Sequence, residues 1–179
     1  MRPLDQVVRS LGTVVIRITK KGSRNLLSCA RQDGTTASAD LGPNLPYHDL
    51  AHFVVERAFG LEDGFFGNIA RGYTPAQLSD KDIIKSLGKE PYRAEILARA
   101  LGSLKTGGCT PSQFEGLVNL ELSHLGLPRM YIEPQVRDAL LAEFKTHLDT
   151  YGRLRDGDSM TLEFIVRRPA VASSNPSLE

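Results

Sequence analysis

The sequence has few cysteines and no excess of charge of either sign. Cys29 and Cys109 are far apart and form no CxxC pair, so the sequence predicts neither a disulfide framework nor a thiolate zinc site. This scarcity favours a reduced, cytoplasmic compartment. The 22 basic and 21 acidic residues give a net charge of +1. That charge supplies no overall field to attract nucleic acid or an anionic membrane, and we expect neither as a partner.

Long apolar runs and nucleotide-binding motifs are also missing. No run approaches the roughly 20 residues that a membrane-spanning helix needs. The first residues, Met1 to Asp5, lack the apolar core of a signal peptide. The glycines form neither a GxGxxG nor a GxxxxGK[ST] pattern, and no serine lies in a GxSxG elbow. These absences argue against a membrane span, a nucleotide site and a serine hydrolase.

The strand signals lie at the two ends of the chain. Alternating apolar residues from Val14 to Ile18 predict a half-buried strand, and turns at 20–23 and 32–34 predict a meander with strands at 25–31 and 35–41. A last strand, with Met160 and Phe164 on one side, follows the turn at 156–158. We expect it to join the N-terminal hairpin in one sheet.

The middle of the chain is predicted to be helical. Thr74-Pro75-Ala76-Gln77 and Thr110-Pro111-Ser112-Gln113 each combine a threonine N-cap with proline and glutamine in capping-box positions. Helices are predicted at roughly 91–105, 111–125 and 134–152. The prediction is an α+β fold, a small antiparallel sheet packed against a helical bundle. We expect residues 1–167 to form one domain and residues 168–179 a disordered tail.

One segment, His48-Asp49-Leu50-Ala51-His52, carries residues that suggest chemistry. On a helix at about 100° per residue, His48, His52, Glu56 and Asp49 fall near 0°, 40°, 80° and 100°, beside an apolar face. The two imidazoles can therefore reach a shared divalent metal ion, zinc or another. Asp49 or Glu56 would add an oxygen, orient an imidazole or transfer protons. The alternative is a helix start at which Asp49 favours the dipole and both histidines are structural.

Two known motifs resemble this segment. The HDLAH core is similar to the HDxxH motif of the zinc-binding proteins of coenzyme Q biosynthesis, which continues to a downstream glutamate; Gly64 occupies that position here. It also resembles the HExxH of zinc metalloproteases, with Asp49 in place of the general-base glutamate. The longer stretch HDLAHFVVE, at 48–56, resembles a family of bacterial proteins of unassigned function, a resemblance that implies no activity.

A second pair of candidate ligands lies in the helix predicted at 111–125. Glu121 falls inside the apolar stripe of that helix, and His124 lies beside it with the Glu-x-x-His spacing of metal sites in helical bundles. A buried carboxylate needs a cation or a hydrogen-bonding partner. We therefore predict that Glu121, with His124, faces the histidine pair. The alternative is that Glu121 pairs with an arginine at the margin of the helix.

These patterns support a metal-assisted hydrolase or lyase that acts on a small molecule, with Asp49 or Glu56 as the acid or base. Two alternatives remain open. The chain could be a non-enzymatic protein whose apolar helices dock a protein partner, or a binding protein that uses the same cleft for an apolar ligand.

Overall fold

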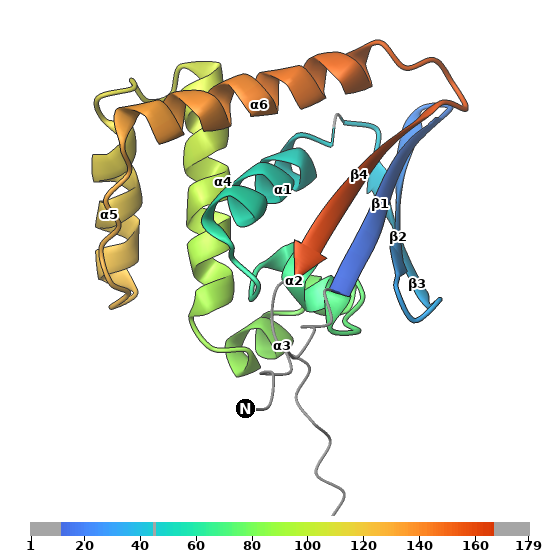
Figure 1. The fold of residues 1–179 in the computed structure, drawn as a ribbon, viewed down its shortest axis with the longest axis horizontal. Helices are drawn as coiled ribbons and strands as arrows, with labels where there is room; N and C mark the ends of the chain where they lie inside the picture. The colour runs from blue at the N-terminus through green and yellow to red at the C-terminus, as the bar shows by residue number, and fades with distance from the viewer. Residues whose placement is uncertain (1–11, 45, 167–179) are drawn as a thin grey trace, which may run out of the picture.

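A four-stranded antiparallel sheet forms one side of the molecule. The computed structural model describes residues 12–44 and 46–166. The strands are β1 (Gly12–Lys21), β2 (Arg24–Arg31), β3 (Thr36–Gly42) and β4 (Ser159–Val166), in the spatial order β3-β2-β1-β4. Figure 1 shows the last strand of the described chain lying beside the first. The predicted α+β class and the pairing of the final strand with the N-terminal hairpin are both confirmed.

The sheet buries one face because its central strands alternate. Val14, Ile16 and Ile18 of β1 are almost fully buried, while residues between them are partly or wholly exposed. Ile16 lies opposite Cys29 and Ile18 opposite Leu27 on β2, so the apolar side chains of both strands line the same face. Helices cover that face (Figure 1).

Six α-helices and one short 3-10 helix connect β3 to β4 in the described chain. The first of them, α1, is the central helix and packs mainly against α4 and α6. Its apolar side, which includes Leu50, Val54 and Val55, is fully buried. The bounds are α1 (Tyr47–Phe59), α2 (Phe65–Ala70), η1 (Gln77–Ser79), α3 (Lys81–Ser86), α4 (Glu90–Thr106), α5 (Phe114–His124) and α6 (Pro134–Gly152).

The three long predicted helices are present, and the largest shift is at the start of α5. Gln113 accepts a hydrogen bond from the backbone N–H of Thr110, as in a capping box, but Thr110–Gln113 form a turn and the helix begins at Phe114. At Thr74 both halves of the capping box form, yet only the short η1 follows. Asp80 then caps α3 through the N–H groups of the next turn.

Two predictions concern the ends of the chain and the membrane. The predicted tail at 168–179 lies outside the described residues. Within the described part of the chain, no helix combines the length and the apolar character needed to cross a bilayer.

Candidate metal centre

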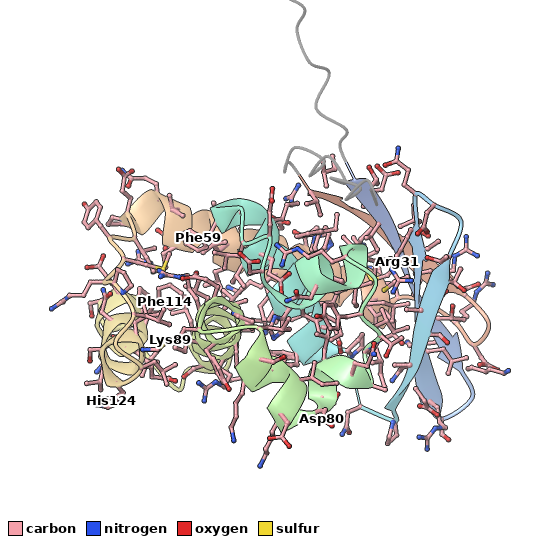
Figure 2. The ribbon with its side chains drawn as sticks, turned by 90° about the horizontal axis from the view of Figure 1, so that it is seen from below. Arg31, Phe59, Asp80, Lys89, Phe114 and His124 are labelled. Carbon is pink, nitrogen blue, oxygen red and sulfur yellow. The ribbon has the colours of Figure 1, made fainter. Side chains whose placement is uncertain are left out.

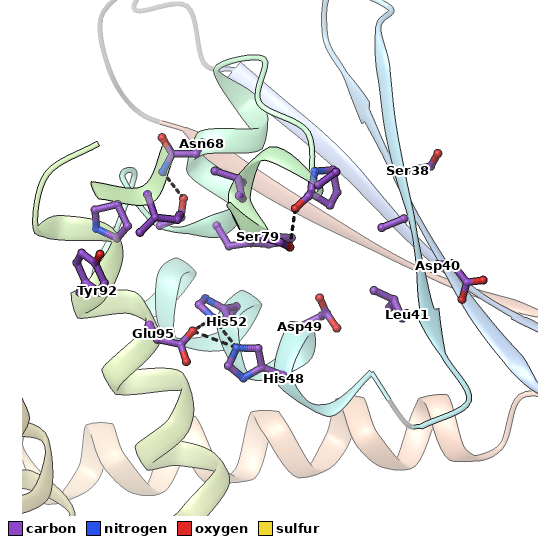
Figure 3. Close-up of a pocket in the computed structure, with 18 residues that line it drawn as sticks. Ser38, Asp40, Leu41, His48, Asp49, His52, Asn68, Ser79, Tyr92 and Glu95 are labelled. Carbon is purple, nitrogen blue, oxygen red and sulfur yellow. Dashed lines mark hydrogen bonds and ion pairs between the residues drawn. The ribbon is translucent and has the colours of Figure 1, made fainter. Parts of the chain in front are cut away.

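Three side chains from two helices bring their ligand atoms to one point. The Nε2 atoms of His48 and His52 are 3.1 Å apart, and each lies 3.1 Å from Oε2 of Glu95 (Figure 3). The residues that the structure describes contain no other group of three or more His, Cys, Asp or Glu side chains placed to share a metal ion. The two histidines were predicted as a pair, and the third member was not.

The helices fix this arrangement. His48 and His52 are one turn apart on α1, so both imidazoles project from the same side of that helix. Glu95 lies on α4, the helix that packs most closely against α1. The side chain of His52 is 8% exposed, whereas those of His48 and Glu95 are 55% and 38% exposed. The group is therefore anchored in the core at His52 and open to solvent on its other side.

The three atoms lie close enough to share a proton or a metal ion. An unprotonated imidazole nitrogen and a carboxylate oxygen both present lone pairs, which repel at this distance unless a nitrogen carries a proton or a metal ion lies between them. Ligand atoms around a tetrahedral zinc at about 2.0–2.1 Å lie about 3.3 Å apart, close to the 3.1 Å found for His48, His52 and Glu95. The group fits three protein ligands of an ion that keeps a fourth position open.

Glu56 contacts His52 at Nδ1, the ring nitrogen that does not face the other candidate ligands. Its Oε1 lies 2.9 Å from Nδ1 of His52 and accepts the backbone N–H of Phe65 at 2.6 Å, while Oε2 accepts that of Phe66 at 2.9 Å. A carboxylate only accepts, so Nδ1 of His52 must carry the proton, which directs the lone pair of the neutral ring at Nε2 toward the other ligands. Glu56 is fully buried. Glu56 thus lies on the histidine side of α1, and both of its oxygens accept hydrogen bonds from protein groups.

The charges of the group are strongly coupled. Burial disfavours the charged form of His52, but hydrogen bonds with Glu56 and Glu95 outweigh it and raise the pKa of His52 to about 9. Burial also opposes ionisation of Glu95, yet hydrogen bonds with His48 and His52 hold the pKa of this carboxyl well below its usual range. In the metal-free protein, these contacts therefore favour the protonated form of His52, paired with both carboxylates.

Asp49 faces a pocket beside the ligand group. The pocket has a volume of about 610 Å³, a typical size for a small-molecule site, and His48, His52, Asp49 and Glu95 all line it. Figure 3 shows Asp49 between His52 and Leu41. Burial raises the pKa of Asp49, although the two imidazoles act in the opposite direction. A carboxyl group of this kind, next to a candidate metal site, is suited to proton transfer.

Glu121 and His124 lie outside the ligand group. Glu121 accepts a hydrogen bond at 2.5 Å from Nη2 of Arg99, whose Nε lies 3.3 Å from Oε1 of Glu95. The guanidinium of Arg99 thus lies between the carboxylates of Glu95 and Glu121. The alternative considered from the sequence, in which Glu121 pairs with an arginine, is the arrangement found. His124 is an exposed residue at the end of α5, on the side of the molecule away from the sheet (Figure 2). The prediction that Glu121 and His124 join the histidine pair is corrected.

The sequence contained a signal for Glu95 that the prediction missed. Glu95 lies on α4 one turn from Pro91 and from Ala98, both of which are buried. It is therefore a carboxylate beside an apolar stripe, the same anomaly that singled out Glu121. Local spacing could not choose between them, because which face of α4 meets α1 depends on tertiary packing.

Comparisons with known proteins found no relative of this chain. No protein-family model, no curated protein and no solved structure matches this chain.

Proposed function

We propose that this protein is a divalent-metal-dependent hydrolase that acts on a small molecule. The observation that carries the proposal is the triangle of His48, His52 and Glu95, whose ligand atoms converge at 3.1 Å at the wall of a pocket of about 610 Å³. Two imidazoles and a carboxylate are a common ligand set of catalytic zinc.

Each residue has a distinct part in this proposal. His48, His52 and Glu95 hold the ion, and Glu56 keeps His52 in the tautomer that binds it. A divalent ion in such a site lowers the pKa of bound water and polarises a substrate carbonyl. Asp49 accepts a proton from the attacking water and returns it to the leaving group. Its raised pKa brings it nearer to the range in which one carboxyl group can do both.

The same residues would also serve a lyase, in which Asp49 removes a proton from a carbon next to a carbonyl. Two imidazoles and a carboxylate with an open position are the ligand set with which zinc activates water, so we favour hydrolysis. The non-enzymatic alternative has His52 protonated between Glu56 and Glu95 as a structural ion pair. That alternative accounts for the three contacts of His52, but it gives no role to the carboxyl group of Asp49, which lines the adjoining pocket beside both imidazoles.

Hydrolysis of a panel of chromogenic esters and anilides, by protein loaded with Zn²⁺, Co²⁺ or Mn²⁺, tests the proposal. Replacing Asp49 by asparagine should lower kcat by about 10²–10⁴-fold and leave metal content unchanged. Replacing Glu95 by glutamine should lower both. Asp40→Asn is the matched control, because Asp40 also lines the pocket but is paired with Arg24. Metal-dependent turnover that survives both Asp49→Asn and Glu95→Gln would contradict the proposal.

A further inference from the structure

Outside the two histidines, the charged side chains in the described lining of the pocket beside the ligand group are all acidic. The charged residues among those that line it are Asp40, Asp49 and Glu95, all acidic, and none of its described lining residues is a lysine or an arginine. The two histidines in the lining are the candidate metal ligands. Glu95 and Asp49 are the carboxylates of the lining that lie next to the site of a bound divalent ion.

Two polar side chains of the wall, Asn68 and Ser79, donate to protein carbonyls. Asn68 donates from Nδ2 to the carbonyls of Asp63 and Gly64, both at 2.8 Å. The hydroxyl of Ser79 donates to the carbonyl of Pro75 at 3.0 Å (Figure 3). These groups hold the loops that shape the pocket, and their donors are directed at protein carbonyls. The hydroxyls of Ser38 and Tyr92 also belong to the lining. Such neutral groups can hydrogen-bond a polar group, but they supply no positive charge to pair with an anion.

The rest of the wall is apolar and comes from several elements. Leu41 of β3, Phe65 of α2, Ile84 of α3 and Tyr92 of α4 line the pocket and are only partly buried. Figure 3 shows Leu41 and Tyr92 on opposite sides of the pocket, with the ligand group between and below them. Partly exposed apolar surface in a concave site is the feature that binds apolar ligands.

We infer that the substrate is an uncharged molecule with a metal-binding carbonyl attached to an apolar body, and that phosphorylated or carboxylated compounds are excluded. This inference rests on the proposed function. An anionic group on the apolar body, away from the metal, would lose its hydration without gaining a cation from the described lining residues. An apolar body would instead cover Leu41, Phe65 and Ile84 and gain free energy in proportion to its buried area.

A matched set of hydroxamic acids tests the inference, because every member places the same chelating group on the metal. The probes are acetohydroxamic acid, octanoyl hydroxamic acid, and a chain of the octanoyl length that ends in a carboxylate. Binding is followed by the visible spectrum of the Co²⁺-loaded full-length protein. Burial of a methylene group is worth roughly fourfold in affinity, the equivalent of about 0.8 kcal/mol. Octanoyl hydroxamic acid should therefore bind at least 30-fold more tightly than acetohydroxamic acid, and the terminal carboxylate should remove most of that gain.

A charge introduced into the wall should reverse this preference. Ile84→Lys places a cation in the pocket, and the carboxylate-ended probe should then bind more tightly than the octanoyl probe. Ile83→Lys is the matched control, since Ile83 precedes it on α3 and does not line the pocket. The order of the probes should be that of the wild type in this control. The Co²⁺ affinity of both variants should match that of the wild type, which also shows that they fold.

The outcomes separate the two proposals. Equal affinity for the acetyl and octanoyl probes, or tighter binding of the carboxylate-ended probe to the wild type, overturns the substrate class while the metal site stands. Failure of the wild type to bind Co²⁺ at His48, His52 and Glu95 overturns the proposed function, and the substrate inference with it.

Discussion

The carboxylate of Glu56 occupies the space that a side chain at position 64 would need. A Cβ atom added to Gly64 would lie 2.3 Å from Cδ of Glu56 and 2.6 Å from each of its oxygens. The backbone of Gly64, with φ of −76°, is open to any residue, so the restriction is one of space alone. The resemblance to the coenzyme Q zinc motif placed a glutamate at this position. Here the candidate carboxylate ligand comes from Glu95 on α4.

Replacing Gly64 by alanine should therefore disturb both stability and the ligand group. We expect a loss of about 2 kcal/mol or more in the free energy of unfolding, because Glu56 must move and leave His52 and two backbone N–H groups without their acceptor. Urea denaturation measures this loss. Gly116→Ala is the control: it lies in α5 with nothing within 4 Å of an added Cβ, and alanine there should be neutral or stabilising by up to about 1 kcal/mol. Equal stability of the two variants would show that Glu56 does not fill this space.

Glu56→Gln should weaken metal binding without removing a ligand. The amide cannot accept the proton of His52 and both backbone N–H groups as the carboxylate does, so the ring loses its fixed tautomer. The affinity for Zn²⁺, measured by competition with a chromophoric chelator, should fall by about 10–100-fold. Glu143→Gln is a matched control, since Glu143 pairs with His147 one turn away on α6, outside the ligand group. The role assigned to Glu56 fails if both variants bind Zn²⁺ as tightly as the wild type.

Metal affinity should increase with pH. The pKa of His52 is raised from 6.5 to about 9 in the metal-free protein, so between these values a metal ion must displace a proton from this ring. The apparent affinity should rise by up to about tenfold per pH unit from pH 6.5 toward pH 9 and then level off. Competition titrations at pH 6.5, 7.5 and 8.5 measure the slope. A flat profile would show that His52 gives up no proton on binding.

The metal-free protein should show the opposite trend in stability. A histidine whose pKa is higher in the folded than in the unfolded state contributes stability that is complete below pH 6.5 and is lost as the pH rises through about 9. The free energy of unfolding should fall by roughly 2–3 kcal/mol across this window. Chelator-treated wild type and His52→Gln, compared by urea denaturation at pH 6, 7.5 and 9, provide the test. The variant should lose this pH dependence, and retention of the wild-type slope would assign it to another group.

Arg99 should have a smaller, indirect effect. It contacts Oε1 of Glu95 and leaves Oε2 to the imidazoles. Arg99→Gln should lower metal affinity by only a few-fold, because the pair is partly exposed and solvent screens it. Arg93→Gln, whose partner Glu90 lies outside the ligand group, is the control and should leave the affinity unchanged. A complete loss of binding in Arg99→Gln would mean that Glu95 is held by this contact rather than by the packing of α4 on α1.

The parts of this account that the sequence predicted depend on local spacing. The alternation around Ile16 placed a strand, and the spacing of four residues placed His48 and His52 on one edge of a helix. The same helical rotation put Glu56 beside them, but it could not show that the start of α2 covers that carboxylate. Rotation about a helix axis gives the direction of a side chain and says nothing of what packs against it.

The sequence did not reveal Glu95 as a candidate ligand, because its position depends on how two helices pack. Glu95 and Glu121 both lie on or beside an apolar stripe, and the sequence alone gives each an equal claim to face the histidines. The packing of α4 on α1 selects Glu95, and the packing of α5 on the other side of α4 leaves Glu121 to Arg99. A contact between residues 43 positions apart has no local signature.

The stoichiometry of Zn²⁺ or Co²⁺ binding to protein without a histidine tag tests the central claim most directly. Measured by titration and by elemental analysis after dialysis, the wild type and Glu121→Gln should each bind one ion per chain. Glu95→Gln and the double variant His48→Ala/His52→Ala should bind none under the same conditions. A wild type without bound metal, or a Glu95→Gln variant that binds one ion as tightly as the wild type, would contradict the account.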